Sequence, residues 1–109
     1  YIGMDDNGEL ILDELAKYLA TGKVKLVTFS LMSNVLGTIT DAEKIISMCK
    51  EYGVLTLIDG AQAVPHMPVN IEKLGCDFFA FSGHKMLGPT GIGVLWVRKS
   101  VLQTMNPFH

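Results

Sequence analysis

The sequence predicts an α/β fold in which about four strands form one sheet, the first three parallel and the last antiparallel, with flanking helices. Apolar, β-branched runs alternate along the chain with segments of helical spacing, and this order produces parallel strands joined by right-handed crossovers. The link before the fourth run is short and rich in glycine. Such a link is marginal for a helical crossover, so it favours an antiparallel last strand.

The first elements of this pattern are a helix over Leu12–Ala20 and a strand over Val24–Leu31. Leucines three and four residues apart share one face of the helix, and Gly22 stands where a glycine commonly ends a helix. The strand reads VKLVTFSL, an apolar and β-branched run that is typical of a buried strand.

A second helix and a second strand follow a polar loop. Thr40 and Glu43 fit a capping box, so we expect a helix from there to Gly53. The second strand is expected over Val54–Ile58 and ends at Asp59. The apolar stripe of the helix consists of Ile45, Ile46, Met48 and Cys49.

The rest of the chain contains a short helix, two further strands and the start of another helix. The short helix is expected over Ile71–Leu74 and stops at Gly75. The third strand is expected over Asp77–Phe81 and the fourth over Ile92–Val97, after a loop that contains two glycines and a proline. The residues Ser100–Met105 begin the last helix.

Composition and charge restrict the function classes. The 109 residues are 49% hydrophobic and 18% charged, which fits one packed domain. A net charge of −2 without a basic run argues against nucleic acid or an anionic membrane as a partner. No apolar stretch reaches the roughly 20 residues of a membrane helix. Two cysteines make no disulfide framework, so we expect a cytoplasmic protein.

Neither His66 nor His109 shows a metal-ligand spacing, and we expect no metal site. The chain opens on Tyr1 rather than on methionine and ends without an obvious tail. We therefore expect residues 1–109 to be part of something longer.

Polar residues follow each of the first three expected strands. In an open α/β sheet, ligands bind outside the carboxyl ends of the parallel strands. We therefore expect the polar residues that follow these strands to converge on one place. They are Ser30 near the end of the first strand with Ser33 and Asn34 beyond it, Asp59 and Gln62 after the second, and Ser82, His84 and Lys85 after the third.

The side chains of this group suit pyridoxal phosphate (PLP). A lysine amine held out of bulk water forms a Schiff base with a carbonyl. PLP enzymes pair that lysine with a carboxylate at the pyridine nitrogen. Lys85 and Asp59 are the candidates for these two roles. Ser82 and His84 could donate hydrogen bonds to a phosphate, and Gln62 could reach a ring oxygen.

Several strings of the sequence resemble the class V aminotransferase family, and most closely its SUF-type cysteine desulfurases and selenocysteine lyases. They are SNVLGT, LIDGAQAV, CDFFAFSGHK and FSGHKMLGPTGIGVLWV. The SGHK-x-x-GPTG-x-G pattern within them is long and specific. The resemblance extends from about Val24 to Met105. It implies that the chain is a fragment of the PLP-binding large domain of fold type I.

The resemblance also implies a role for each candidate residue. Lys85 would be the Schiff-base lysine, and Asp59 would be the partner of the pyridine nitrogen. The other implied cofactor-binding positions are Gln62 at the phenolic oxygen, Ser82 and His84 at the phosphate, and Asn34 near the substrate and the ring.

For the parent enzyme, the resemblance implies release of sulfur or selenium from cysteine or selenocysteine to give alanine, in iron–sulfur cluster assembly. A homodimer, an amino-acid substrate and a sulfur-acceptor protein are implied partners. In the family, the histidine that stacks on PLP and another phosphate-binding segment lie upstream of this segment. The catalytic cysteine and the arginine for the substrate carboxylate lie downstream. Neither Cys49 nor Cys76 matches the catalytic cysteine of the family. We therefore expect no complete desulfuration by this chain alone.

Two other readings remain open at the level of sequence. The parent could be another class V enzyme, such as an aminotransferase or a kynureninase-like enzyme, because the residues that select the substrate are absent. The chain could also be a truncated, non-catalytic module that keeps the fold and self-associates through exposed sheet edges.

Overall fold

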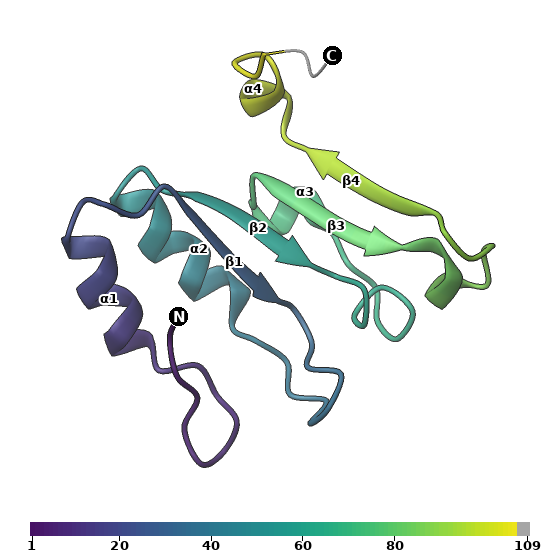
Figure 1. Ribbon diagram of the computed structural model, residues 1–109, viewed down its shortest axis with the longest axis horizontal. Coiled ribbons are helices and arrows are strands. Elements are labelled where there is room, and N and C mark those ends of the chain that lie inside the picture. Colours follow the sequence, from purple (N-terminus) through teal and green to yellow (C-terminus); the bar gives the residue numbers. More distant parts are fainter. Residues whose placement is uncertain (107–109) are drawn as a thin grey trace.

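The computed structural model describes residues 1–106, and the interpretation of His109 lies outside them. These residues form one four-stranded sheet with helices packed on one of its faces (Figure 1). The strand order is β1-β2-β3-β4. The strands are β1 Leu26–Ser30, β2 Leu55–Asp59, β3 Phe78–Ser82 and β4 Gly93–Val97. Pairing is parallel from β1 to β3 and antiparallel between β3 and β4, which confirms the predicted sheet.

Four α-helices and one 3₁₀ helix accompany the sheet in the described residues. Both α1 and α3 have the bounds that the sequence predicts, and only the 3₁₀ helix η1 was not predicted. The helices are α1 Leu12–Ala20, α2 Ala42–Glu51, α3 Ile71–Leu74, η1 Gly83–Met86 and α4 Lys99–Leu102. None of the helices in residues 1–106 is long and apolar enough to cross a membrane.

The core lies between the sheet and α1, α2 and α3. Alternate strand residues face it, and Ile58 and Phe79 are fully buried there against α2 and α3. Val27 and Phe29 pack toward α1 and α2. The opposite face of the sheet carries no helix of residues 1–106, as the strands in front of α2 and α3 illustrate (Figure 1). Its apolar side chains include Leu26, Leu55 and Leu95, with exposed fractions of 44%, 37% and 57%.

The start of α2 differs from the predicted capping box. The cap is Asp41, whose carboxylate accepts a hydrogen bond from the Lys44 amide at 3.2 Å. The Thr40 hydroxyl instead donates to the Ser30 carbonyl oxygen at 2.7 Å. An aspartate is as good a cap as threonine, and the shift by one residue releases Thr40 to bind the end of β1. The loop between β1 and α2 is thereby fastened to the sheet.

A polar network joins three strands at the amino end of β3. One carboxylate oxygen of Asp77 accepts from the Thr56 amide at 2.9 Å and from the Thr56 hydroxyl at 3.2 Å. The other lies 3.4 Å from Nε of Arg98. The Arg98 guanidinium also donates to the carbonyl oxygens of Gly75 and Cys76. Buried Thr56 is thus fully paired, and β2, β3 and β4 are fixed to one another at this end.

Candidate active site

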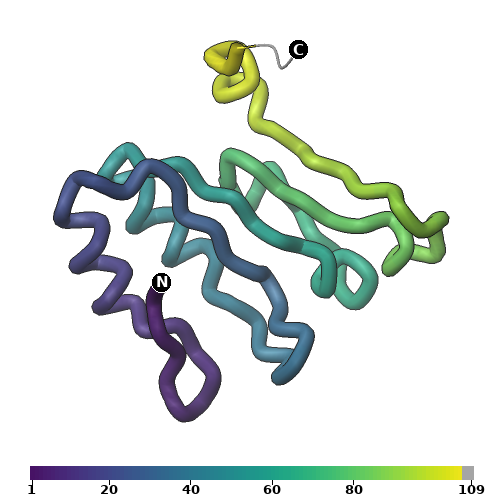
Figure 2. The backbone as a smooth tube through the Cα atoms, viewed as in Figure 1, coloured from purple at the N-terminus to yellow at the C-terminus, as the bar shows by residue number. Residues whose placement is uncertain are grey.

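The first three strands end at the same edge of the sheet. Ser30 lies opposite Asp59 in the register of β1 and β2, and Asp59 lies opposite Ala80 in that of β2 and β3. Neighbouring strands are about 4.8 Å apart, so Ser30, Asp59 and Ala80 lie within about 10 Å of one another, and β3 continues two residues further to Ser82. The arrowheads of β1, β2 and β3 point the same way, whereas β4 runs back (Figure 1), and the loops that follow the three strands lie along one edge (Figure 2).

Asp59 ends β2 with an exposed carboxylate. One of its oxygens accepts a hydrogen bond from the Ala61 amide at 2.9 Å. Its second oxygen has no hydrogen-bond donor among residues 1–106. The backbone around it is tightly held, because the Asp59 carbonyl accepts from the Leu31 amide at 2.9 Å and the Gly60 amide donates to the Ala80 carbonyl at 2.8 Å. The carboxylate is therefore oriented and still able to bind a donor.

Gly60 is required by the packing beneath this carboxylate. A Cβ atom at Gly60 would collide with the ring of Phe79, which is fully buried. The chain can turn away from β2 at this point only because no side chain is present. Asp59 is consequently carried on a strand end whose path is set by the core.

Ser82 projects from the same face of the sheet as Asp59. It lies two residues beyond Ala80, the partner of Asp59, and strand residues two apart point to the same side. This is the face that no helix of residues 1–106 covers. Ser82 is half-buried, and its hydroxyl makes no hydrogen bond within the described part of the chain. His84 and Lys85 follow in η1, where both side chains are exposed.

The turn that carries Lys85 is closed by backbone hydrogen bonds. The Gly83 amide donates to the Ile92 carbonyl at 2.8 Å. The Gly83 carbonyl accepts from the Leu87 amide, and from the Gly88 amide at 2.9 Å. Leu87 has φ 62°, the only positive φ of a residue other than glycine among residues 1–106. This closure was not predicted, although the glycines of the GPTG string were its signal in the sequence.

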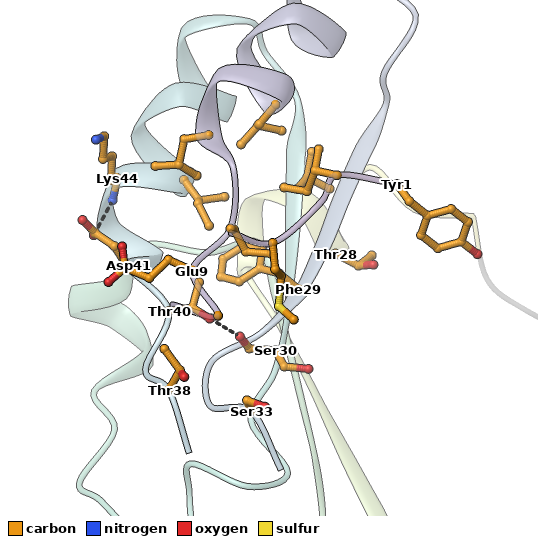
Figure 3. Close-up of a pocket in the computed structure, with 18 of the residues that line it drawn as sticks. Tyr1, Glu9, Thr28, Phe29, Ser30, Ser33, Thr38, Thr40, Asp41 and Lys44 are labelled. Atoms are coloured by element: carbon orange, nitrogen blue, oxygen red, sulfur yellow. Dashed lines mark hydrogen bonds between the residues drawn. The ribbon is translucent and has the colours of Figure 1, made fainter. Parts of the chain in front are cut away.

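The two remaining candidates lie in the loops after β1 and β2. Gln62 is half-buried in the turn that follows Asp59. Asn34 is exposed in the turn that follows β1, and it lines a cavity of about 790 Å³. Ser33 and Thr38 line the same cavity and are labelled in Figure 3. Ser30 also lines that cavity, whereas none of the candidates after β2 and β3 does so: Asp59, Gln62, Ser82, His84 and Lys85. The structure therefore brings Asp59, Ser82, His84 and Lys85 to one edge, with Asn34 at the far side of β1.

Neither cysteine belongs to this group. Cys49 lies in α2 and Cys76 lies just before β3 at the opposite end of the sheet, and both side chains are fully buried. Burial is the main cause that raises the pKa of each thiol above its ordinary value. A nucleophilic cysteine needs an accessible thiolate, so both thiols are packed groups of the core rather than nucleophiles.

A family model described as aminotransferase class V matches residues 1–109. The chain belongs to this family. Among curated relatives, a probable cysteine desulfurase of Mycobacterium leprae is 50% identical over 106 residues, which are 97% of this chain and 17% of that protein. A probable cysteine desulfurase of Streptomyces coelicolor is 47% identical over 108 residues, which are 99% of this chain and 26% of that protein.

Solved structures show the same relationship. A cysteine desulfurase from Thermococcus onnurineus matches with a TM-score of 0.83 and 42% identity, over 95% of this chain and 26% of that one. The cysteine desulfurase CsdA from Escherichia coli matches with a TM-score of 0.87 and 36% identity, over 97% and 26%. The predicted fold class, part of a PLP fold type I domain, is thereby confirmed. The chain spans about a quarter or less of the length of these relatives.

Proposed function

We propose that this chain is the PLP-binding core of a cysteine desulfurase-like enzyme. The observation that carries the proposal is the grouping of an oriented carboxylate, Asp59, with Lys85 and two hydrogen-bonding side chains at the carboxyl end of a parallel sheet. That edge is where open α/β sheets bind ligands. The names of the related proteins support the same assignment.

The donor set fits PLP group by group. Asp59 keeps one carboxylate oxygen for the protonated pyridine nitrogen while the Ala61 amide holds the other. Lys85 supplies the amine that bonds covalently to the cofactor's carbonyl carbon. The hydroxyl of Ser82 and the imidazole of His84 donate to the phosphate. Gln62 is assigned to the phenolic oxygen, and Asn34 to the neighbourhood of the substrate.

When bound, PLP draws electrons away from the Cα atom of an amino acid, which makes bonds around that atom easier to break. Lys85 then holds and returns protons beside Cα as the acid–base group. In the net reaction the Cβ–Sγ bond of cysteine breaks, an acceptor thiol takes the sulfur as a persulfide, and Cβ takes a proton to leave alanine. The acceptor thiol lies outside this chain, since Cys49 and Cys76 are buried.

The size and shape of the molecule support the proposal that residues 1–109 are a fragment of the large domain. The radius of gyration is 14.6 Å, whereas a compact domain of this length has about 13 Å. The shortest dimension is only 24 Å. These values describe two layers, with apolar side chains such as Leu95 exposed on the face without a helix. Further layers of a longer chain would cover that face.

The assignment extends to the setting of the parent enzyme. We place it in the cytoplasm as a homodimer that passes sulfur to an acceptor protein for iron–sulfur cluster assembly. Cysteine and selenocysteine are both candidate substrates, because their reacting bonds occupy the same position.

The proposal is tested on the full-length polypeptide that contains this chain. Purified with PLP and given cysteine and a thiol acceptor, it should form one alanine for each sulfur transferred. Lys85→Ala should lower this rate by about a thousandfold or more, as expected for loss of a group that acts in the reaction itself. A parallel assay with selenocysteine separates the two substrates. Full activity of Lys85→Ala, or transamination in place of alanine release, would contradict the proposal.

A further inference from the structure

The turn that carries Lys85 is exposed, and yet several backbone hydrogen bonds close it. Both backbone polar groups of Gly83 are engaged, the amide with Ile92 and the carbonyl with Leu87 and Gly88. The bond to Ile92 continues the antiparallel pairing of β3 and β4. Lys85 therefore lies in a loop of six residues whose two ends meet at one carbonyl group, and that carbonyl is anchored to the sheet.

Gly88 is at the meeting point because there is no space for a side chain. A Cβ atom there would lie 2.8 Å from the Gly83 carbonyl oxygen and 3.2 Å from its carbon. Both atoms belong to the backbone, so they cannot rotate away as the end of a side chain would. Gly91, three residues later, is the opposite case, since it has φ 82° and nothing within 4 Å of a Cβ atom. Gly88 is required because backbone atoms lie too close for a side chain, whereas Gly91 is required because its φ is positive.

Leu87 completes the closure at a conformational cost. Its φ of 62° lies in the left-handed region, which residues with a Cβ atom adopt rarely. Its side chain is fully exposed, at 104%, so packing within residues 1–106 does not offset that cost. The left-handed conformation is what directs the Leu87 amide to the Gly83 carbonyl. Backbone strain held beside a candidate catalytic residue is a recurrent feature of functional sites.

We infer that Leu87 and Gly88 are positioning residues for Lys85. Their amides close the turn on the Gly83 carbonyl and so hold the lysine at the end of β3, the strand that carries Ser82. Opening the turn would leave the contacts of Asp59 and Ser82 in place but would let Lys85, together with its neighbour His84, spread over many positions. Covalent attachment of PLP would slow, because a reacting amine must be held close to its target. This inference rests on the proposed function, since it assigns the bonding amine to Lys85.

The test compares Gly88→Ala with Gly91→Ala in the full-length polypeptide that contains this chain. Apoprotein is mixed with PLP, and samples are reduced with borohydride at successive times. The lysine amine adds to the PLP aldehyde and water leaves. Hydride then adds to the carbon, and the nitrogen takes a proton, which leaves a stable secondary amine for mass spectrometry. We expect attachment at Lys85 to be slowed about tenfold or more by Gly88→Ala. Gly91→Ala also strains the backbone, because Gly91 has a positive φ, but it lies outside the closed turn. It therefore controls for a general loss of stability and should slow attachment less than about twofold.

A second pair of variants covers the case in which Gly88→Ala does not fold. Valine resists the left-handed conformation because it is β-branched, whereas asparagine adopts it readily. Leu87→Val should therefore slow attachment at Lys85, and Leu87→Asn should not, although both remove the leucine side chain. Hydrogen exchange of the Gly88 amide, measured without PLP, should be accelerated in Leu87→Val and unchanged in Leu87→Asn.

The outcomes separate the two proposals. Attachment of PLP to another residue in the unsubstituted protein would contradict the proposed function. Attachment at Lys85 with equal rates in Gly88→Ala and Gly91→Ala, or in the two Leu87 variants, would contradict the positioning role alone. Slow attachment confined to Gly88→Ala and Leu87→Val would support it.

Discussion

The two ends of the sheet use polar residues in opposite ways. At the amino end of β3, Asp77 accepts two hydrogen bonds from Thr56 and pairs with Arg98, and the Arg98 guanidinium binds two carbonyl oxygens. At the carboxyl end, Asp59 receives one backbone hydrogen bond. Ser82, His84 and Lys85 make no side-chain hydrogen bond within residues 1–106. At the amino end the polar side chains are paired with one another and with the backbone. At the carboxyl end most of the polar side chains remain available for hydrogen bonds to another molecule.

This difference separates the polar residues that the chain itself satisfies from those that we propose bind the cofactor. In residues 1–106, every buried side-chain nitrogen or oxygen atom has a hydrogen-bond partner, so unused capacity is confined to accessible positions. Several such groups gathered at the edge where parallel strands end are positioned to bind something from outside. Changes at the amino end should therefore affect stability, and changes at the carboxyl end should affect cofactor binding.

The largest effect is expected from Asp77→Ala. It leaves the amide and hydroxyl of buried Thr56 without an acceptor, and it removes the charge that faces Arg98. We expect the free energy of unfolding to fall by about 2–4 kcal/mol, measured by denaturant titration. Asp59→Ala is the matched control, with an expected change within about 0.5 kcal/mol because that carboxylate is exposed. If the two variants lost equal free energy of unfolding, the proposed difference between the two ends of the sheet would be wrong.

The reverse contrast is expected for PLP affinity. Asp59→Ala removes the residue that we propose as the partner of the pyridine nitrogen, so PLP should bind about a hundredfold more weakly, the value of one hydrogen bond to a charged group. Absorbance titration of the full-length apoprotein measures this affinity. Loss of a hydroxyl at the amino end, in Thr56→Val, should leave the affinity unchanged while it lowers stability. A normal affinity for Asp59→Ala would remove Asp59 from the site.

A smaller effect is expected at the phosphate. Ser82→Ala and His84→Ala should each weaken PLP binding about tenfold, the lower end of the range for a hydrogen bond to a charged group, because the other residue still binds the phosphate. The matched measurement uses pyridoxal, which lacks the phosphate. Binding of pyridoxal should be unaffected by either substitution. If PLP and pyridoxal are weakened equally, these two residues do not contact the phosphate.

The smallest effect is expected from the buried thiols. Burial raises the pKa of Cys49 and Cys76, so the folded chain keeps these protons at a pH where the unfolded chain has lost them. The resulting contribution to stability is complete below the ordinary thiol pKa of about 8.5 and is lost as the pH rises above it. Urea titrations should show stability falling above that pH, and less steeply in Cys49→Ala. Rapid reaction of either thiol with a disulfide reagent in the folded state would contradict this account.

The sequence predicts the sheet well because the signals for it are local. The strand runs, the glycines that end α1 and α3, and the short link before β4 each specify one element. The cap of α2 was predicted at Thr40 and lies at Asp41, since both residues are good caps and only the contact of Thr40 with Ser30 decides between them. That contact joins residues ten apart and has no local signature.

The candidate site was predictable in part for the same reason. Strand ends place Asp59 and Ser82 at one edge once the strand order is known, and the SGHK string adds His84 and Lys85. The closed turn at Leu87 was not predictable, because a leucine carries no propensity for positive φ. Nor does any residue pattern indicate that Asn34 lines a separate cavity, which depends on the packing of β1, α1 and α2.

The most direct test of the central claim, that the carboxyl end of this sheet binds PLP through Lys85, is a peptide map. Full-length polypeptide loaded with PLP is reduced with borohydride, digested and sequenced by mass spectrometry. The account predicts the cofactor on Lys85 and on no other lysine, and its loss from that peptide in Lys85→Ala. Modification of Lys44 or Lys50 on α2, or no modification at all, would contradict it.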